Sequence, residues 1–418
     1  MNVISVLVVL AFRLATLLVF VASAASCRSM PDPSAIATFD DEVRFLSRYV
    51  EAVVLGDPRT GPAAIVVPAW QGRVMTSASD GGSPGYGWVH HAFIARRELV
   101  PHMNAFGGED RFWLGPEGGQ FGLFFAPGDQ FDVDHWQAPA VIDTEPFEVV
   151  TQDRRRISMR RRASVVNYAG TRFDVEIARE VRLLSRADAS EAFGISLDAR
   201  LRFVAFESRN RITNCGETAW TKSGGLLCIW ILGMFKPGRE VTVVLPFSGE
   251  KARAGERIVN DDYFGRVAAD RLKVGERAAY FRADGSERGK IGVGPEHALD
   301  VIGSYDAAKD LLTIVQYSRS PSATEYVNSE WRIQEAPFAG DVVHSYNDGP
   351  LTPGSAALGG FYELETSSPA AALRPQESMT HVHRTMHLQG PAELLTPIAE
   401  RVLGQSIEEI ARALPVQK

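Results

Sequence analysis

The sequence predicts a mainly β protein: a large antiparallel β-sandwich with a helix before it and a helical tail after it. Residues 173–183, FDVEIAREVRL, alternate apolar and charged side chains, the period-two pattern of a strand with one buried face. Similar short runs recur between Gly, Pro, Asn and Asp residues. Helical stretches do not alternate with these runs, which disfavours a parallel α/β fold.

The composition is that of an ordinary soluble domain. The chain has 418 residues, of which 45% are hydrophobic and 23% charged, with a net charge of −7. This length allows a large core, and β-sandwiches often remain single domains at this size. An acidic balance gives no sign of a nucleic-acid partner, and we expect no cofactor.

The N-terminus has the pattern of an export signal. Leu14–Ala25 is an apolar run of signal-peptide length, and the sequence AASC ending at Cys27 resembles a bacterial lipobox. We predict a signal peptide at 1–26, lipid attachment at Cys27 and a linker at 27–37. The protein would then be exported to the periplasm or cell envelope and held at the membrane by its lipid. A plain secretory signal or membrane anchor is the alternative.

The elements follow in order along the chain. Thr38–Leu55 has apolar residues near helical spacing behind two aspartates, which predicts a helix. The sandwich is expected over 38–390, and the tail, 391–418, returns to helical spacing with a break at Gly404. Strands are predicted at Ala63–Pro68, Gly122–Phe125, Phe173–Leu183, Arg202–Phe206, Val241–Phe247, Leu311–Tyr317 and Met379–Leu388.

One glycine-bounded loop, NAFGGEDRFWLGPEGG at 104–119, combines carboxylates with aromatic residues. Carboxylates accept hydrogen bonds from sugar hydroxyls, and an indole face packs against the C–H side of a sugar ring. A structural turn with an internal Arg–carboxylate pair is the alternative. The residues predicted to bind substrate, here and in a weaker repeat downstream, are Glu109, Asp110, Arg111, Trp113, Glu117, His135 and Trp136.

Three histidines lie on one predicted strand. His381, His383 and His387 are spaced at i, i+2 and i+6, so they share one face. A metal site with Glu363 is one interpretation. We favour a solvent-facing sheet surface and no metal, since further ligands at suitable spacing are missing.

The two cysteines after Cys27 also allow two interpretations. In an exported protein Cys215 and Cys228 could pair, but two cysteines do not make a disulfide framework. Two small thiols buried on neighbouring strands explain them equally well.

Other polar segments have structural explanations. Residues 260–265, NDDYFG, and 344–349, HSYNDG, are typical of turns, with a sugar or calcium contact as the alternative. Arg154–Arg156 and Arg160–Arg162 suggest a solvated sheet edge that resists strand pairing. An anionic ligand or lipid headgroups are the alternative partners of these arginines.

A C-terminal segment resembles a known family. FYELETSSPAAAL, from Phe361, followed by LRPQE at 373–377, resembles the C-terminal signature of aldose 1-epimerases, the galactose mutarotases. RITNCG at 211–216 resembles the family's turn between core strands. The resemblance to the galactose mutarotase-like superfamily extends over about 53–390. It is nearest to bacterial exported proteins that share GGEDRFWLGPEGG and FYELETSSPAAAL.

The resemblance implies a supersandwich with a sugar cleft on its concave face and Glu365 as the base that takes the anomeric proton. The family's acid is a histidine on the strand after the core turn, but residues 224–230, GGLLCIW, have none. Lys222, Glu109 or His135 could replace it. Three hypotheses remain: an isomerase of the epimerase type, a non-catalytic glycan-binding envelope lipoprotein, and a structural envelope protein with a decayed cleft.

Overall fold

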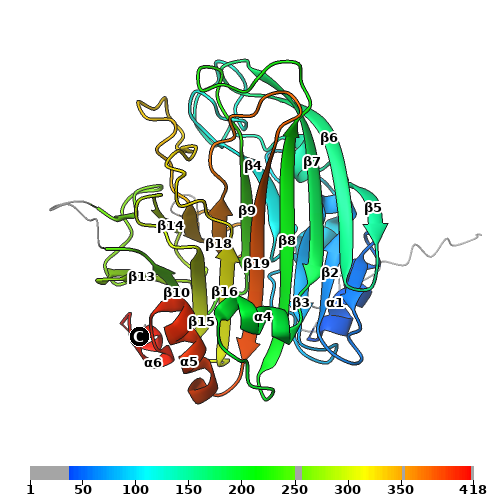
Figure 1. Cartoon of the computed structure of the whole chain (residues 1–418), viewed down its shortest axis with the longest axis vertical. Coiled ribbons are helices and arrows are strands. Elements are labelled where there is room, and N and C mark those ends of the chain that lie inside the picture. The colour runs from blue at the N-terminus through cyan, green and yellow to red at the C-terminus, as the bar shows by residue number, and fades with distance from the viewer. Residues whose placement is uncertain (1–36, 250–256, 351–353, 416–418) are drawn as a thin grey trace, which may run out of the picture. The chain divides into compact units, whose positions relative to one another are not determined.

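The computed structural model describes residues 37–249, 257–350 and 354–415. The predicted signal peptide, Cys27 and all but the last residue of the predicted linker lie outside these residues. The described residues form antiparallel sheets with a helix at their beginning and two helices at their end, so the predicted fold class is confirmed (Figure 1). Among them, no helix is long and apolar enough to cross a bilayer.

The largest sheet has ten strands and includes most of the strands predicted from alternation. Its order is β12-β13-β10-β15-β16-β19-β8-β7-β6-β5. In that order the strands are Leu272–Val274, Ala278–Arg282, Val241–Pro246, Val301–Asp306, Leu311–Tyr317, Ser378–Gln389, Arg202–Asn214, Arg172–Leu183, Arg156–Val166 and Glu148–Gln152.

Two smaller sheets carry the remaining strands. The six-stranded sheet has the order β11-β14-β17-β18-β9-β4, and the three-stranded sheet is β1-β2-β3. The six strands are, in that order, Val259–Asn260, Gly289–Val293, Val343–Asn347, Tyr362–Ser367, Cys228–Phe235 and Arg111–Gly115. The three are Val53–Gly56, Ala63–Val67 and Arg73–Ala78.

The main core lies between the ten-stranded sheet and the smaller sheets. Inward-facing residues such as Ile177 of β7, Ile231 of β9 and Val66 of β2 belong to one buried cluster. A second cluster covers part of the other face of the large sheet, where α4 (Arg186–Phe193), α5 (Ala392–Leu403) and α6 (Ile407–Ala411) pack (Figure 1). Part of the large sheet is therefore buried on both faces.

The N-terminal helix is shorter than predicted. α1 spans Phe39–Leu46 and begins with a capping box between Thr38 and Asp41. Val53 and Val54, which the helical spacing included, belong instead to β1 and pair with β2. Pairing with a neighbouring strand suits these β-branched residues better than a further turn of helix.

The other predicted elements are mostly found. The predicted strand at Gly122–Phe125 is wrong, because these residues form bends held by contacts such as the Leu123 amide to the Pro116 carbonyl. The helical tail is confirmed, and α5 ends at Gly404, whose φ of 69° favours glycine. The described helices also include α2 (His91–Arg96), α3 (Ala140–Asp143) and a 3₁₀ turn at Pro68–Trp70.

Candidate functional site

The candidate site is built on one face of the six-stranded sheet. On β18, Glu363 and Glu365 are two residues apart, so their side chains point to the same side. The strand register places His344 of β17 opposite Glu365 and Tyr346 opposite Glu363. Lys290 of β14 pairs in turn with Tyr346. Three strands therefore bring two carboxylates, an imidazole, a phenol and an ammonium to one face.

Two further strands extend this face. Arg111 and Trp113 of β4 pair with Leu232 and Trp230 of β9, and Leu232 also pairs with Glu365. The intervening residues of these strands point the other way, into the core between the sheets. Alternation thus separates a charged and aromatic face from an apolar one within the same strands.

Two adjoining cavities lie over this face. The first, of about 350 Å³, is bordered by mainly aromatic and apolar residues such as Trp113, Trp136 and Phe361, and we call it the aromatic lobe. The second, of about 690 Å³, includes His344 and Asp341 and is called the polar lobe. Cavities of roughly 300–1,000 Å³ accommodate small ligands. Both lobes are bordered by Glu117, Trp230, Phe264, Arg288, Lys290 and Trp331.

Glu365 is fully buried by protein atoms but faces the aromatic lobe. Its Oε2 accepts hydrogen bonds from Trp230 Nε1 at 3.0 Å and Lys290 Nζ at 2.8 Å. Its Oε1 has no hydrogen-bond partner within the described structure. A buried carboxylate oxygen without a partner is costly, so Oε1 is available to a donor on a ligand.

Glu363 lies beside Glu365 and is held by Arg111. Arg111 Nη2 donates to Glu363 Oε1 at 2.7 Å, and the guanidinium lies 4.4 Å from the centre of the Trp113 ring. Burial, together with the neighbouring Glu365 carboxylate, raises the pKa of Glu363, although Arg111 acts in the opposite direction. Glu363 therefore holds a proton more readily than an exposed glutamate does.

Glu117 reaches the same cavities from the loop after β4. Trp136 Nε1 donates to its Oε1 at 2.8 Å. Burial raises the pKa of Glu117, and the charge of Glu365 acts in the same direction, against the effect of Lys290. A carboxyl group with a raised pKa that faces a cavity is a candidate proton donor.

His344 borders the polar lobe, although the sequence pattern around it predicts a turn. The segment forms strand β17, and alternation points His344 and Tyr346 toward the lobes. His344 Nδ1 lies 3.9 Å from Glu365 Oε2 and has no hydrogen-bond partner within the described residues. Burial, and then the charge of Lys290, lower the pKa of His344 well below its usual value, so the ring is neutral at pH 7.

Tryptophans form the walls of the aromatic lobe. Trp136 and Trp331 stack with ring centres 6.1 Å apart, and Trp113 meets Trp230 edge-on at 5.5 Å. The Trp113 Nε1 is buried without a hydrogen-bond partner within the described residues. These rings offer flat apolar surfaces beside the charged groups of β18.

The polar lobe includes the predicted turn at 260–265. Asn260 Nδ2 donates to Asp341 Oδ2 at 3.1 Å, and the Tyr263 hydroxyl donates to the same oxygen. Gly292 of β14 lies directly beneath them, since a Cβ there would come within 2.5 Å of the Tyr263 hydroxyl and 2.7 Å of Asp341 Oδ2. The segment 260–265 therefore lies where it could contact a ligand, which was the alternative to a purely structural turn.

Two predicted site residues lie in the protein interior instead of at either lobe. Asp110 forms an ion pair of 2.5 Å with Arg179, and both side chains are fully buried. Glu109 accepts hydrogen bonds from Ser77 and is 2.9 Å from His387 Nε2. Glu109 and Asp110 precede β4 and point into the interior of the protein, and this corrects their assignment to the cleft.

Two other candidates lie at the surface. His135 is 2.6 Å from Asp132 and 42% exposed, and this hydrogen bond raises its pKa. Lys222 is paired with Glu325, also at the surface. Of the three proposed replacement acids, Lys222, Glu109 and His135, none lies at the cleft. The predicted residues that do border the lobes are Arg111, Trp113, Glu117, Trp136 and Glu365.

The histidine strand faces inward, which corrects the prediction of a solvent-facing surface. His381 and His383 are both within 2.9 Å of the Thr366 hydroxyl, and His387 contacts Thr313. Burial lowers the pKa of His381 to about 3 and that of His383 to about 4. Within the described ranges no cluster of His, Cys, Asp and Glu could hold a metal ion.

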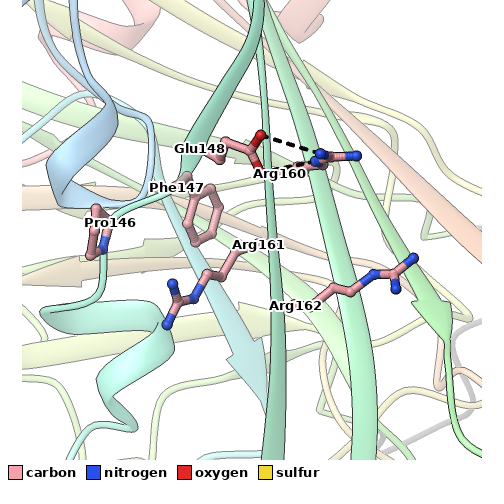
Figure 2. A pocket seen from close by; sticks show the side chains of 6 residues that line it. All are labelled: Pro146, Phe147, Glu148, Arg160, Arg161 and Arg162. Atoms are coloured by element: carbon pink, nitrogen blue, oxygen red, sulfur yellow. Dashed lines mark hydrogen bonds and ion pairs between the residues drawn. The ribbon is translucent and has the colours of Figure 1, made fainter.

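The sequence pattern also singles out two cysteines and two arginine segments. Cys215 and Cys228 are both free, and Cys228 is buried. β5 lies at the sheet edge outside β6, so the arginines of β6 are not on the edge strand itself. A groove of about 600 Å³ is bordered there by Pro146, Phe147, Glu148 and residues 160–162 (Figure 2).

The arginines of this groove are already neutralised. Arg160 pairs with Glu148 at 3.1 Å, as the dashed lines in Figure 2 show. Arg161 pairs with Glu145, and Arg162 pairs with a glutamate of β7. The groove therefore offers little net charge to an anionic ligand, and the cleft on the six-stranded sheet is the stronger candidate site.

Solved structures of similar chain path include proteins from several bacteria. A protein from Synechocystis sp. PCC 6803 is 14% identical, with a TM-score of 0.49 over 82% of this chain and 96% of that one. A putative aldose 1-epimerase from Escherichia coli K12 is 12% identical, with a TM-score of 0.45 over 81% and 98%. A galactose mutarotase-like protein from Lactobacillus casei ATCC 334 is 8% identical, with a TM-score of 0.44 over 81% and 100%.

The last two descriptions name the superfamily that the sequence motifs resemble. Similarities at these identities and scores concern the path of the chain and carry no functional weight. No curated protein matches the chain by sequence. A family model matches residues 37–414, nearly the whole described chain, and the protein therefore belongs to the family of unknown function DUF6786.

Proposed function

We propose that this protein binds a sugar or oligosaccharide in the two-lobed cleft and isomerises it at the anomeric carbon, as an aldose epimerase does. One observation carries the proposal. Among the described residues nothing donates a hydrogen bond to Glu365 Oε1, and Glu365 borders a lobe walled by tryptophans. Sugars combine hydroxyl donors with apolar C–H faces, and this site offers an acceptor and aromatic surfaces together.

The proton transfers would use two carboxyl groups. Glu365 Oε1 would take the proton of the anomeric hydroxyl while the bond between the anomeric carbon and the ring oxygen breaks. Glu117, whose pKa is raised by burial, would give its proton to the ring oxygen. After rotation of the open-chain aldehyde, the reverse transfers close the ring as the other anomer. Both protons return to their starting groups.

A second candidate function is glycan binding without catalysis, as an envelope lipoprotein would perform it. The observation that favours it is the pairing of both β18 carboxylates with cations: Glu365 with Lys290, and Glu363 with Arg111. Ion pairs of this kind can hold a binding surface in place without taking part in any proton transfer. The neutral His344 also stores no proton to give.

Export belongs to the same proposal. We infer from the sequence of residues 1–27 that the protein is exported to the cell envelope and anchored by a lipid on Cys27. Mass spectrometry of the protein purified from a bacterial membrane would detect an acylated Cys27. Recovery of the protein in the soluble cytoplasmic fraction with residues 1–26 intact would contradict it.

Exchange NMR of anomeric protons tests the catalytic proposal. The wild-type protein should accelerate anomer interconversion of at least one aldose in a panel of common sugars. Glu365→Gln keeps the size of the side chain but removes the base, so the acceleration should fall by about 10²- to 10⁴-fold. Glu148→Gln is a matched control, since Glu148 is a glutamate ion-paired with Arg160 in the groove of Figure 2.

The possible results separate the two functions. If Glu365→Gln retains full activity, the catalytic role is wrong. Sugar binding without acceleration by the wild type supports the non-catalytic function. A sugar panel that shows neither binding nor turnover overturns both.

A further inference from the structure

We propose that the ligand of this cleft is an acidic sugar, and that Arg288 binds its carboxylate. This inference rests on the proposed function and adds the substrate class. Arg288 precedes β14 and borders both lobes, two residues from Lys290. A ligand that spans the lobes would pass its side chain.

The guanidinium of Arg288 packs against an aromatic ring and has no counter-ion in the part of the chain that the structure describes. It lies 3.6 Å from the centre of the Phe264 ring, so one flat face is covered. Its Nε is buried and has no hydrogen-bond partner among the described residues. No carboxylate of the described residues forms an ion pair with it. Donors at the edge of a fixed guanidinium suit a planar carboxylate, which can accept two parallel hydrogen bonds.

Unlike Arg288, the other cations around the two lobes each have a carboxylate partner. Lys290 is 2.8 Å from Glu365, and Arg111 is 2.7 Å from Glu363. Arg257 pairs with Asp261, and Arg332 pairs with Glu330. The paired arginines of the groove in Figure 2 show the same contrast. Of the cations that the structure describes around the cleft, Arg288 is therefore the one whose charge remains to be balanced by a ligand.

The charge and the position of this residue define the ligand further. One uncompensated positive charge matches a single negative charge, as on a uronic acid, better than the double charge of a phosphate. The tryptophans of the aromatic lobe would pack against one sugar ring, while Arg288 would hold the carboxylate at the boundary between the lobes. The occupant would then be an oligosaccharide that contains uronic acid units.

Isothermal titration with matched trisaccharides tests this proposal. The pairs are galactose and galacturonate, glucose and glucuronate, and mannose and mannuronate trimers. At least one uronate trimer should bind the wild type about 10- to 100-fold more tightly than its neutral match. Arg288→Gln should abolish that preference, while Arg288→Lys should keep part of it, because lysine retains the charge but not the planar fork. High salt should weaken binding of the uronate but not of the neutral trimer.

Arg332→Gln is the matched control. Arg332 borders the polar lobe, but it is 72% exposed and already paired with Glu330, so its loss should leave the preference unchanged. Equal binding of neutral and acidic trimers, or a preference unaffected by Arg288→Gln, overturns the acidic-sugar proposal alone. Absence of binding by every trimer overturns the sugar-binding function with it. Sugar sulfates and phosphates serve as additional arms, and tighter binding of either would replace the carboxylate as the recognised group.

Discussion

Two pairs of acidic residues, one in the interior and one in the cleft, are almost equally buried, but only the cleft pair lies next to a cavity. Glu109 and Asp110 in the interior are 0% exposed, and Glu363 and Glu365 in the cleft are at most 5% exposed. Each pair has cationic or imidazole partners, and each retains an oxygen without a hydrogen bond among the described residues, on Asp110 and on Glu365.

The two pairs differ in whether a ligand could reach them. Protein atoms surround Glu109 and Asp110 between the sheets, whereas Glu363 and Glu365 border the aromatic lobe. Burial and ion pairing by themselves therefore do not identify a functional carboxylate in this protein. The same chemistry stabilises the fold where it is enclosed, and it can bind a ligand where a cavity adjoins it.

The largest expected effect is on stability, from breaking the interior pair. Asp110→Asn leaves the Arg179 guanidinium fully buried without its counter-charge, so the free energy of unfolding should fall by about 3–5 kcal/mol. Urea unfolding measures this change. Glu365→Gln is the comparison, since Lys290 borders both lobes and can reach water there. Its cost should be smaller, about 1–3 kcal/mol, because the Lys290 ammonium keeps some contact with the cleft. Equal losses in the two variants would remove the distinction between the regions.

The second effect is on the pH dependence of stability. Burial lowers the pKa of His381 to about 3, and an unfolded histidine titrates near 6.5. The stabilising effect of the neutral ring is therefore complete above pH 6.5 and is lost as the pH falls toward 3. Between pH 6 and 4.5 this residue should remove about 1.4 kcal/mol of unfolding free energy per pH unit.

His381→Gln should make the decline of stability with acid shallower by about that amount, as measured by urea unfolding at several pH values. His135→Gln is the control, because His135 lies at the surface and its removal should leave the slope nearly unchanged. An unchanged slope in His381→Gln would show that this interior ring is not held neutral.

Local sequence patterns predicted the strands of the large sheet because alternation depends on neighbours in the chain. β7, β16 and β19 lie within two residues of their predicted bounds. One prediction about the large sheet was wrong: the histidines of β19 point into the protein instead of toward solvent. We expected the apolar side chains alone to be buried, but helices cover part of one face and the six-stranded sheet covers the other. The Thr366 hydroxyl then hydrogen-bonds one nitrogen of each of two buried imidazoles, those of His381 and His383.

The cleft was only partly predictable, since it depends on which strands become neighbours. Glu365, Glu117 and Trp136 were found from local motifs, and they border the same lobe. Lys290 and His344 were missed because their position opposite or beside Glu365 is fixed by the register of strands far apart in sequence. The alternation of 343–347, VHSYN, was the signal that could have placed His344 on a sheet face.

The smallest expected effect isolates one hydrogen bond of the cleft. Trp136→Phe keeps an aromatic ring against Trp331 but removes the Nε1 donor to Glu117. Water in the cavity can replace this donor in the free protein, so the free energy of unfolding should be nearly unchanged. Affinity for the sugar should fall by about 1 kcal/mol, because a ligand that displaces the water leaves Glu117 one hydrogen bond short.

Titration of both proteins with the same sugar measures the difference. Trp220→Phe is the matched control, since Trp220 is buried in the core beside Phe173 and borders neither lobe. That substitution should reduce stability without changing affinity, the reverse of the result expected for Trp136→Phe. If Trp136→Phe instead lowers stability as much as the control does, the Trp136–Glu117 contact belongs to the enclosed interior. In that case, bordering a cavity would not distinguish Trp136 from a residue of the enclosed core.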